Sequence, residues 1–272
     1  MDFRILGPVD VRGAAGPVQL GGQRNRIVLA TLLLSHGTPV SATRLIDDVW
    51  AARPPDTARN QIQICVSQLR STFRDTMQRR IRTRHPGYLL DLDGCGFDAA
   101  RFCVWEREAE QAVARGDLTT AVALLARALR LWRGPALDGV DSATAQSAAA
   151  RWNERHLVAW ERYAELCLAA GWPELVVAGL RQLVVEYPLR ERPHELFMLA
   201  LYRSGAQSEA LEVYRAYRDR VCDSLGLDPG QRLRRMEQAI LGQCPTLTAT
   251  VPVQAPWAAQ QQPEVVPLGG VH

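Results

Sequence analysis

The stretch from Asp56 to Asp75, DTARNQIQICVSQLRSTFRD, constrains the fold more than any other part of the chain. With about 100° between successive residues of a helix, its apolar side chains fall in one narrow arc, the stripe by which a helix packs on a core. Asp56 is expected to be the N-cap, because a side-chain acceptor and a negative charge favour a helix start. The stripe consists of Ala58, Ile62, Val66, Leu69 and Phe73.

The opposite face of this helix combines amides, hydroxyls and one isoleucine, with arginines at its edges. Amide side chains can bind a base edge at two points, an isoleucine methyl can contact a thymine methyl, and arginines suit guanine edges and phosphates. This face is therefore chemically suited to the major groove of DNA. An ordinary solvated helix has a similar face, so the neighbouring elements decide between the two interpretations.

Those neighbours predict a winged helix-turn-helix. Short apolar runs at 3–6, 9–11 and 18–20, divided by Gly and Pro, indicate a leading antiparallel sheet. Helices are predicted over 23–35 and 42–50, the second with Ser41 as its N-cap. After the third helix, 81–84 and 88–92 flank His85-Pro86-Gly87 as a β-hairpin. In this geometry the third helix enters the major groove and the hairpin tip reaches the minor groove.

The rest of the chain is predicted to be helical. Helices of similar length, separated by Gly or Pro, recur with a period of roughly 34 residues, as in tetratricopeptide-type hairpins. The chain is therefore expected to be mainly α with a small β component: a DNA-binding domain at 1–93, an all-α tetratricopeptide-like domain at 94–241 and a flexible Pro- and Gln-rich tail at 242–272. The expected helices are 98–115, 118–132, 143–170, 173–187, 192–204, 207–225 and 229–241.

Composition argues against an enzyme. All 32 basic side chains are arginine, so a P-loop or Schiff-base lysine is impossible, and neither GxSxG nor HExxH occurs. The six cysteines form no CxxC pair and are expected to be small buried hydrophobes in a reducing cytosol. No catalytic residue, metal site or cofactor is therefore expected. Residues 1–93 hold 13 Arg against 8 acids, which confines any contact with a polyanion to the first domain.

Several motifs together resemble one family, the Streptomyces antibiotic regulatory proteins (SARPs) in their small form. These proteins join an OmpR-type DNA-binding domain to a bacterial transcriptional activation domain. The motifs in the first domain are RNRIVLATLLL (24–34), VSATRLIDDVW (40–50), CVSQLR (65–70) and TRHPGYLL (83–90). Those in the second are FDAARF (97–102), ALRLWRGPAL (128–137), YPLRERPHELFMLA (187–200), LYRSGAQSEA (201–210) and LGLDPGQRL (225–233).

The resemblance implies an activator of a secondary-metabolite (antibiotic) biosynthetic gene cluster. Such a protein binds direct repeats in double-stranded DNA near the −35 region as a head-to-tail homodimer. It recruits the RNA polymerase holoenzyme through the sigma factor and core subunits. A cytoplasmic, nucleoid-associated location without membrane contact is expected, since the chain shows no apolar span and no signal peptide.

Carrying the OmpR-type contacts over by position gives two sets of expected DNA contacts. The residues expected to contact bases are Asn60, Gln61, Ile64, Ser67, Gln68 and, near the hairpin tip, Arg84. The residues expected to contact phosphates are Arg24, Arg26, Arg44, Arg59, Arg70, Arg74, Thr83 and His85.

One alternative stays open. The helical domain could be a protein-interaction scaffold that binds a partner in a concave groove, while the first domain has no sequence-specific DNA binding. Affinity for a repeat-containing promoter and for random DNA, compared at several salt concentrations, separates the two.

Overall fold

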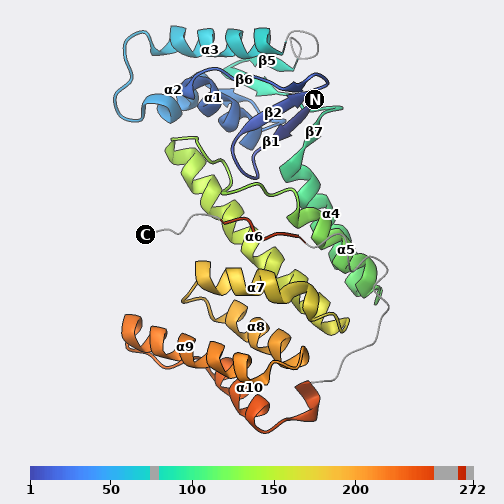
Figure 1. Ribbon diagram of the computed structural model, residues 1–272. Coiled ribbons are helices and arrows are strands. Elements are labelled where there is room, and N and C mark those ends of the chain that lie inside the picture. The colour runs from blue at the N-terminus through green and yellow to red at the C-terminus, as the bar shows by residue number, and fades with distance from the viewer. Residues whose placement is uncertain (74–79, 248–262, 268–272) are drawn as a thin grey trace. The chain divides into compact units, whose positions relative to one another are not determined.

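The computed structural model describes residues 1–73, 80–247 and 263–267 (Figure 1). The chain divides into two compact units. The first contains Met1–Phe102 and Leu131–Arg155, and the second contains Cys103–Arg130 and His156–His272. Every strand of the described residues lies in the first unit, and helices make up most of the rest. The prediction of a mainly α chain with a small β component is therefore confirmed.

The leading sheet has the strand order β3-β2-β1-β7. Its antiparallel part was expected, but the third strand is two residues long and precedes the predicted run at 18–20. The last strand was not expected: β7 pairs in parallel with β1 and places Phe97 opposite Phe3. The strands are β1 (Asp2–Arg4), β2 (Asp10–Gly13), β3 (Gly16–Pro17) and β7 (Gly96–Phe97).

Three helices follow, α1 (Gln23–Leu34), α2 (Ala42–Trp50) and α3 (Ala58–Thr72). Ser41 caps α2 as predicted, since its hydroxyl accepts a hydrogen bond from the Arg44 amide at 3.1 Å. The predicted Asp56 cap of α3 is wrong. The Ala58 amide donates to the Pro55 carbonyl at 2.9 Å, so the chain first makes a turn and Thr57 becomes the N-cap.

The core under these helices contains the whole predicted stripe of α3. Ala58, Ile62, Val66, Leu69 and Phe73 are each at most 4% exposed. The Phe73 ring packs edge-on against Phe3 of β1, with 6.1 Å between the ring centroids. Burial of this stripe leaves the opposite face of α3 on the surface of the unit.

The β-hairpin, or wing, is present as β5 (Ile81–Arg84) and β6 (Gly87–Leu90). A third short strand, β4 (Val40–Ser41), pairs with β6, so the wing joins the chain just before α2. A Cβ at Gly87 would overlap the Val40 carbonyl oxygen, which explains why only glycine fits there. Within the hairpin Arg84 pairs with Gly87, directly at the turn.

The second unit is built from helices whose ends differ by at most three residues from the predicted ones. Its core holds Trp160, Tyr163 and Phe197, none more than 2% exposed. Arg190 and Glu161 join two helices through an ion pair of 2.7 Å. Its helices are α4 (Asp98–Ala114) and α6 (Ala143–Ala169), which begin in the first unit, with α5 (Leu118–Leu129), α7 (Glu174–Glu186), α8 (Glu191–Arg203), α9 (Gln207–Leu225) and α10 (Gln231–Leu241).

Parts of the expected flexible tail are ordered. A 3-10 helix spans Pro245–Leu247, and the Leu247 carbonyl accepts a hydrogen bond from Arg203 at 2.6 Å. Val265 is 6% exposed and lies beside Gly179 of α7, which Trp160 of α6 also approaches. The described parts of the tail therefore pack on the second unit, which corrects the expectation for them.

The cysteines follow the expectation from the sequence only in part. Cys65 and Cys167 are buried as expected, but Cys222 is exposed. No described helix has the length and apolar character needed to cross a bilayer.

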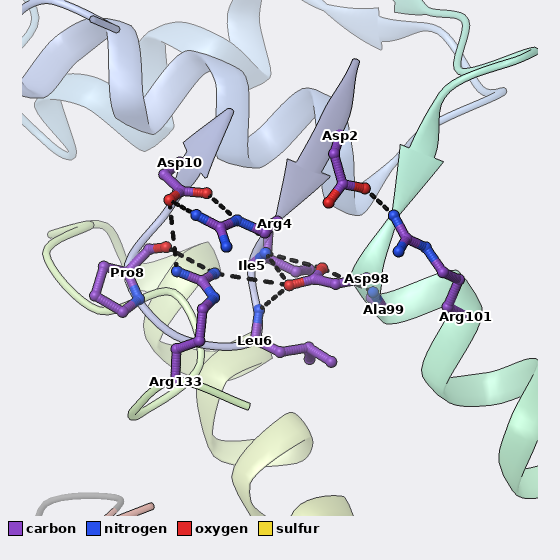
Figure 2. A network of polar contacts seen from close by, with 10 residues as sticks. All are labelled: Asp2, Arg4, Ile5, Leu6, Pro8, Asp10, Asp98, Ala99, Arg101 and Arg133. Atoms are coloured by element: carbon purple, nitrogen blue, oxygen red, sulfur yellow. Dashed lines mark hydrogen bonds and ion pairs between the residues drawn. The ribbon is translucent and has the colours of Figure 1, made fainter. Parts of the chain in front are cut away.

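Residues 131–155 belong to the first unit through a network around Asp98, the first residue of α4 (Figure 2). The Asp98 carboxylate accepts hydrogen bonds from the amides of Ile5, Leu6 and Ala99 at 2.7 to 3.0 Å. Arg133 lies 3.7 Å from Asp98 and donates to the Pro8 carbonyl at 3.1 Å. Burial raises the pKa of the Asp98 carboxyl, and the amides and Arg133 offset part of that rise.

Candidate nucleic-acid interface

The free face of α3 has the composition expected of a DNA-reading surface. Asn60, Ser67 and Gln68 are exposed, and Ile64 among them is 54% exposed. An apolar side chain of this size on a polar face suits contact with a thymine methyl. Figure 1 shows α3 with the wing strands beside it, so helix and hairpin can be offered to DNA together. Gln61 is the one expected base-contacting residue that is half-buried.

Gln61 is engaged within the protein at both ends of its amide. Its Oε1 accepts a hydrogen bond from Arg24 Nη1 at 2.6 Å, and its Nε2 donates to Thr57 Oγ1 at 2.9 Å. The Arg24 guanidinium also lies over the Trp50 ring, 5.3 Å from its centroid. The first turn of α1 is thereby held against α3, and Arg24 is brought to the edge of the free face of α3.

Gln68 is engaged at its oxygen. Asn25 Nδ2 donates to Gln68 Oε1 at 3.0 Å and to the Leu20 carbonyl at 3.1 Å. Sequence reasoning missed Asn25, because nothing in RNRIVLATLLL marks its second residue as a partner of a residue 43 positions later.

An open hollow of about 440 Å³ lies between the first turn of α1 and α3. Burial raises the pKa of the Cys65 thiol in its wall, and nearby Arg24 offsets part of the rise, so this thiol contributes a neutral, apolar surface. The hollow is lined by Gly22, Gln23, Arg24, Asn25, Gln61, Ile64, Cys65 and Gln68.

Arg70 connects α3 to the wing. Its Nε donates to the Ile81 carbonyl and its Nη2 donates to Thr83 Oγ1, both at 2.9 Å. The guanidinium also lies 5.9 Å from the centroid of the Tyr88 ring. Arg70 therefore holds the wing at the end of α3, while Thr83 has its hydroxyl shared with Arg70.

The other expected phosphate contacts are distributed around this face. Arg24, Arg26, Arg44, Arg59, Thr83 and His85 are exposed, as is the expected base contact Arg84. Arg26 Nη1 faces Gly139, 3.8 Å from where a Cβ would stand there. Arg74 lies outside the described residues.

The positive charge on α3 and the wing is only partly neutralised by carboxylates. Arg82 pairs with Asp91 at 2.8 Å. For Arg59 and Arg84, no ion pair with a carboxylate occurs within the described ranges. These two guanidinium groups keep their charge available to a polyanion. In the described part of the chain, no three His, Cys, Asp or Glu side chains gather where they could hold a metal ion.

Comparisons with known proteins cover both units. Residues 17–90 match the family model described as "Transcriptional regulatory protein, C terminal". Residues 97–241 match the model described as "Bacterial transcriptional activator domain". The first match ends at the wing and the second begins at β7.

Curated relatives match over nearly the whole chain. Transcriptional regulator RedD of Streptomyces coelicolor is 39% identical over 91% of this chain and 72% of its own length. Regulatory protein AfsR of the same species is 37% identical over 90% of this chain, but the match covers only 24% of that longer protein.

A solved structure shares the fold. Mycobacterium tuberculosis EmbR, solved in complex with a low affinity phosphopeptide, has a TM-score of 0.81 and 33% identity to this chain. The match covers 93% of this chain and 66% of that one. Fold, both family models and the named relatives agree, and the chain therefore belongs to the Streptomyces antibiotic regulatory protein family of transcriptional regulators, with an OmpR-type DNA-binding region followed by a bacterial transcriptional activation domain.

Proposed function

We propose that this protein activates a secondary-metabolite biosynthetic gene cluster by binding direct repeats near the −35 region and recruiting RNA polymerase. The observation that carries the proposal is the free face of α3, where Asn60, Ser67 and Gln68 surround an Ile64 that is 54% exposed. Polar side chains that can bind base edges, next to an exposed methyl group, match what the major groove displays. The proposed location is the cytoplasm, where the protein is bound to the nucleoid.

In the proposed complex α3 lies in the major groove and the wing reaches the adjacent minor groove. Asn60, Gln61, Ile64, Ser67 and Gln68 contact bases, and Arg84 enters the minor groove from the hairpin turn. Gln61 exchanges its bonds with Arg24 and Thr57 for a base contact when DNA binds. The phosphate contacts are Arg24, Arg26, Arg44, Arg59, Arg70, Arg74, Thr83 and His85.

Recruitment of polymerase is assigned to protein contacts with the sigma factor and core subunits. The membership in a family of activators supports this step, and so does a second unit made of paired helices, an architecture that presents extended surfaces to protein partners. Two copies bind head to tail because direct repeats, unlike palindromes, present the same face twice in one orientation.

Nuclease footprinting on the promoters beside the protein's own gene tests DNA binding. The expected result is a protected region with two direct repeats near the −35 element. In vitro transcription with purified holoenzyme then tests activation: transcript from that promoter rises with added protein and does not rise when one repeat is scrambled. Protection without increased transcription would contradict recruitment, and no protected region on any of these promoters would contradict the choice of target.

A further inference from the structure

We propose that buried Asn25 fixes the amide of Gln68 so that Gln68 turns its NH₂ group to DNA and reads a keto base, guanine or thymine. The inference deepens the proposed function and rests on it. In the major groove guanine and thymine present the acceptors O6 and O4, whereas adenine and cytosine present amino donors at the corresponding positions. A glutamine that presents its NH₂ group outward favours the first class over the second.

The orientation of Asn25 is set by the backbone. Asn25 is 6% exposed, and its Nδ2 lies 3.1 Å from the carbonyl oxygen of Leu20. A backbone carbonyl can only accept a hydrogen bond, so the side-chain atom facing it is the NH₂ group. Gly21, with φ of +79°, brings the chain so close that a Cβ there would stand 2.8 Å from Asn25 Nδ2. Asn25 therefore has one permitted orientation.

The orientation of Gln68 follows from that of Asn25. The second hydrogen of Asn25 Nδ2 points to Gln68, 3.0 Å away. The Gln68 atom at this distance must accept a hydrogen bond, so it is Oε1. The reverse orientation would place two NH₂ groups against each other at hydrogen-bond distance beside a buried side chain. Gln68 Nε2 is thus turned away from Asn25, and among the described residues no acceptor is bonded to either of its hydrogens.

This orientation decides which base is read. A glutamine that recognises adenine uses Oε1 and Nε2 side by side, accepting from N6 and donating to N7. In this protein the bond from Asn25 uses one lone pair of Oε1 and holds that oxygen toward Asn25, which disfavours the paired arrangement. The two hydrogens of Nε2 can instead meet N7 and O6 of guanine, or O4 of thymine. Asn25 is a positioning residue, because it acts on DNA only through Gln68.

Quantitative binding of the full chain to every single-base variant of its footprinted site tests the inference. Gln68→Ala, a surface change, first identifies the base pair that Gln68 reads, as the position where discrimination is lost. There the unchanged protein should prefer guanine or thymine to adenine and cytosine by about tenfold, the scale of one base contact. Preference for adenine or cytosine would overturn the inference, and so would a Gln68→Ala protein that keeps discrimination at every position.

Asn25→Ala then tests the positioning role. The freed Gln68 amide can turn, so the preference for keto bases should fall below about threefold at that one position, with unchanged affinity for random DNA. Unaltered preference in a folded Asn25→Ala protein would overturn the role of Asn25. Gln63→Ala is the matched control, since Gln63 is an exposed glutamine of the same helix outside the proposed contacts and should change no preference.

Asn25→Asp provides a second variant of nearly the same shape, and its thermal unfolding is measured beside that of Asn25→Ala. An acceptor now faces Gln68, which should turn its NH₂ group inward and move the preference toward adenine or cytosine. A retained keto preference in this variant contradicts the inference. If instead the unchanged protein does not distinguish its site from random DNA at all, the proposed function itself fails, an outcome separable from the others.

Discussion

Single side chains on α3 divide into those held by the protein and those left for a partner. Gln61 and Arg70 have bonds within the chain, whereas Asn60 and Arg59 are exposed. Sequence periodicity could place all four on the correct face, because a helix repeats its direction every few residues. It could not say which were already engaged, since Arg24 and Thr83 come from other elements.

Asn60 is expected to contribute to sequence specificity without changing the affinity for random DNA. Asn60→Ala should weaken binding to the specific site by about 1 to 3 kcal/mol through loss of a base contact, and should leave random-DNA binding unchanged. Titration of both DNAs in one buffer measures the difference. Gln63→Ala is the control and should match the unchanged protein on both. Equal losses on specific and random DNA would show that Asn60 does not contact bases.

His156 is expected to make the second unit sensitive to acid. It is 1% exposed, and burial lowers its pKa from 6.5 to about 3. Between these values the unfolded chain binds a proton that the folded chain does not. Stability is therefore full above pH 6.5 and is lost as the pH falls, by about 1.4 kcal/mol per pH unit. Denaturant unfolding at several pH values measures this slope, and His156→Gln should reduce it. An NMR titration showing His156 protonated near pH 6 would contradict the prediction.

Helices were predicted well where Gly or Pro residues nearby in the sequence determine their ends. The helices between residues 98 and 241 lie between Gly and Pro breaks that the sequence shows directly, for example Gly226, which ends α9 with φ of +66°. The two-residue strands β3, β4 and β7 were not predicted, because so short a segment has no periodicity and β4 and β7 form only by pairing with β6 and β1. The cap of α3 was misplaced because the turn from Pro55 to Ala58 precedes the helix.

The link between α3 and the wing predicts different roles for two arginines. Arg70→Ala removes the bonds to Ile81 and Thr83, so it should loosen the wing and lower stability by about 1 to 3 kcal/mol. Arg59→Ala should leave stability unchanged and reduce the slope of log affinity against log salt by about 1, as loss of one phosphate contact does.

Thermal unfolding of both variants separates these roles, hydrogen exchange at the β5 amides reports the wing directly, and salt titration of Arg59→Ala measures its phosphate contact. Faster exchange is expected in Arg70→Ala alone. If Arg59→Ala also unfolds earlier, or if Arg70→Ala leaves both exchange and stability unchanged, the assignment of the two arginines is wrong.

At the scale of the whole molecule, the first unit includes residues 131–155, which come after α4 and α5 in the sequence. The Arg133 amide donates to the Leu6 carbonyl at 3.0 Å, and the Leu137 amide donates to the Ile5 carbonyl at 2.8 Å. Thr144 and Thr31 both donate to Asp48, at 2.5 and 2.7 Å. A domain boundary placed at residue 93, after the predicted hairpin, leaves out the contacts of Arg133, Leu137 and Thr144, which join residues about a hundred or more positions apart.

Asp98 is the residue on which this arrangement depends most. Asp98→Asn replaces one acceptor oxygen by an NH₂ group that faces backbone amides, so a buried donor loses its partner. The cost should be about 1 to 3 kcal/mol in the first unit, and more for Asp98→Ala. Chemical denaturation followed by a probe in each unit measures this. An unchanged midpoint in the first unit would contradict the role of Asp98, whereas the second unit serves as the internal control.

Sequence-specific binding is tested by the affinity of the full chain for its own promoter repeat and for random DNA of equal length, across a salt series. We expect at least a hundredfold preference for the repeat, a steep fall of both affinities with salt, and loss of most of the preference in Asn60→Ala. Equal affinity for the two DNAs at every salt concentration would contradict it and would favour a protein-interaction scaffold.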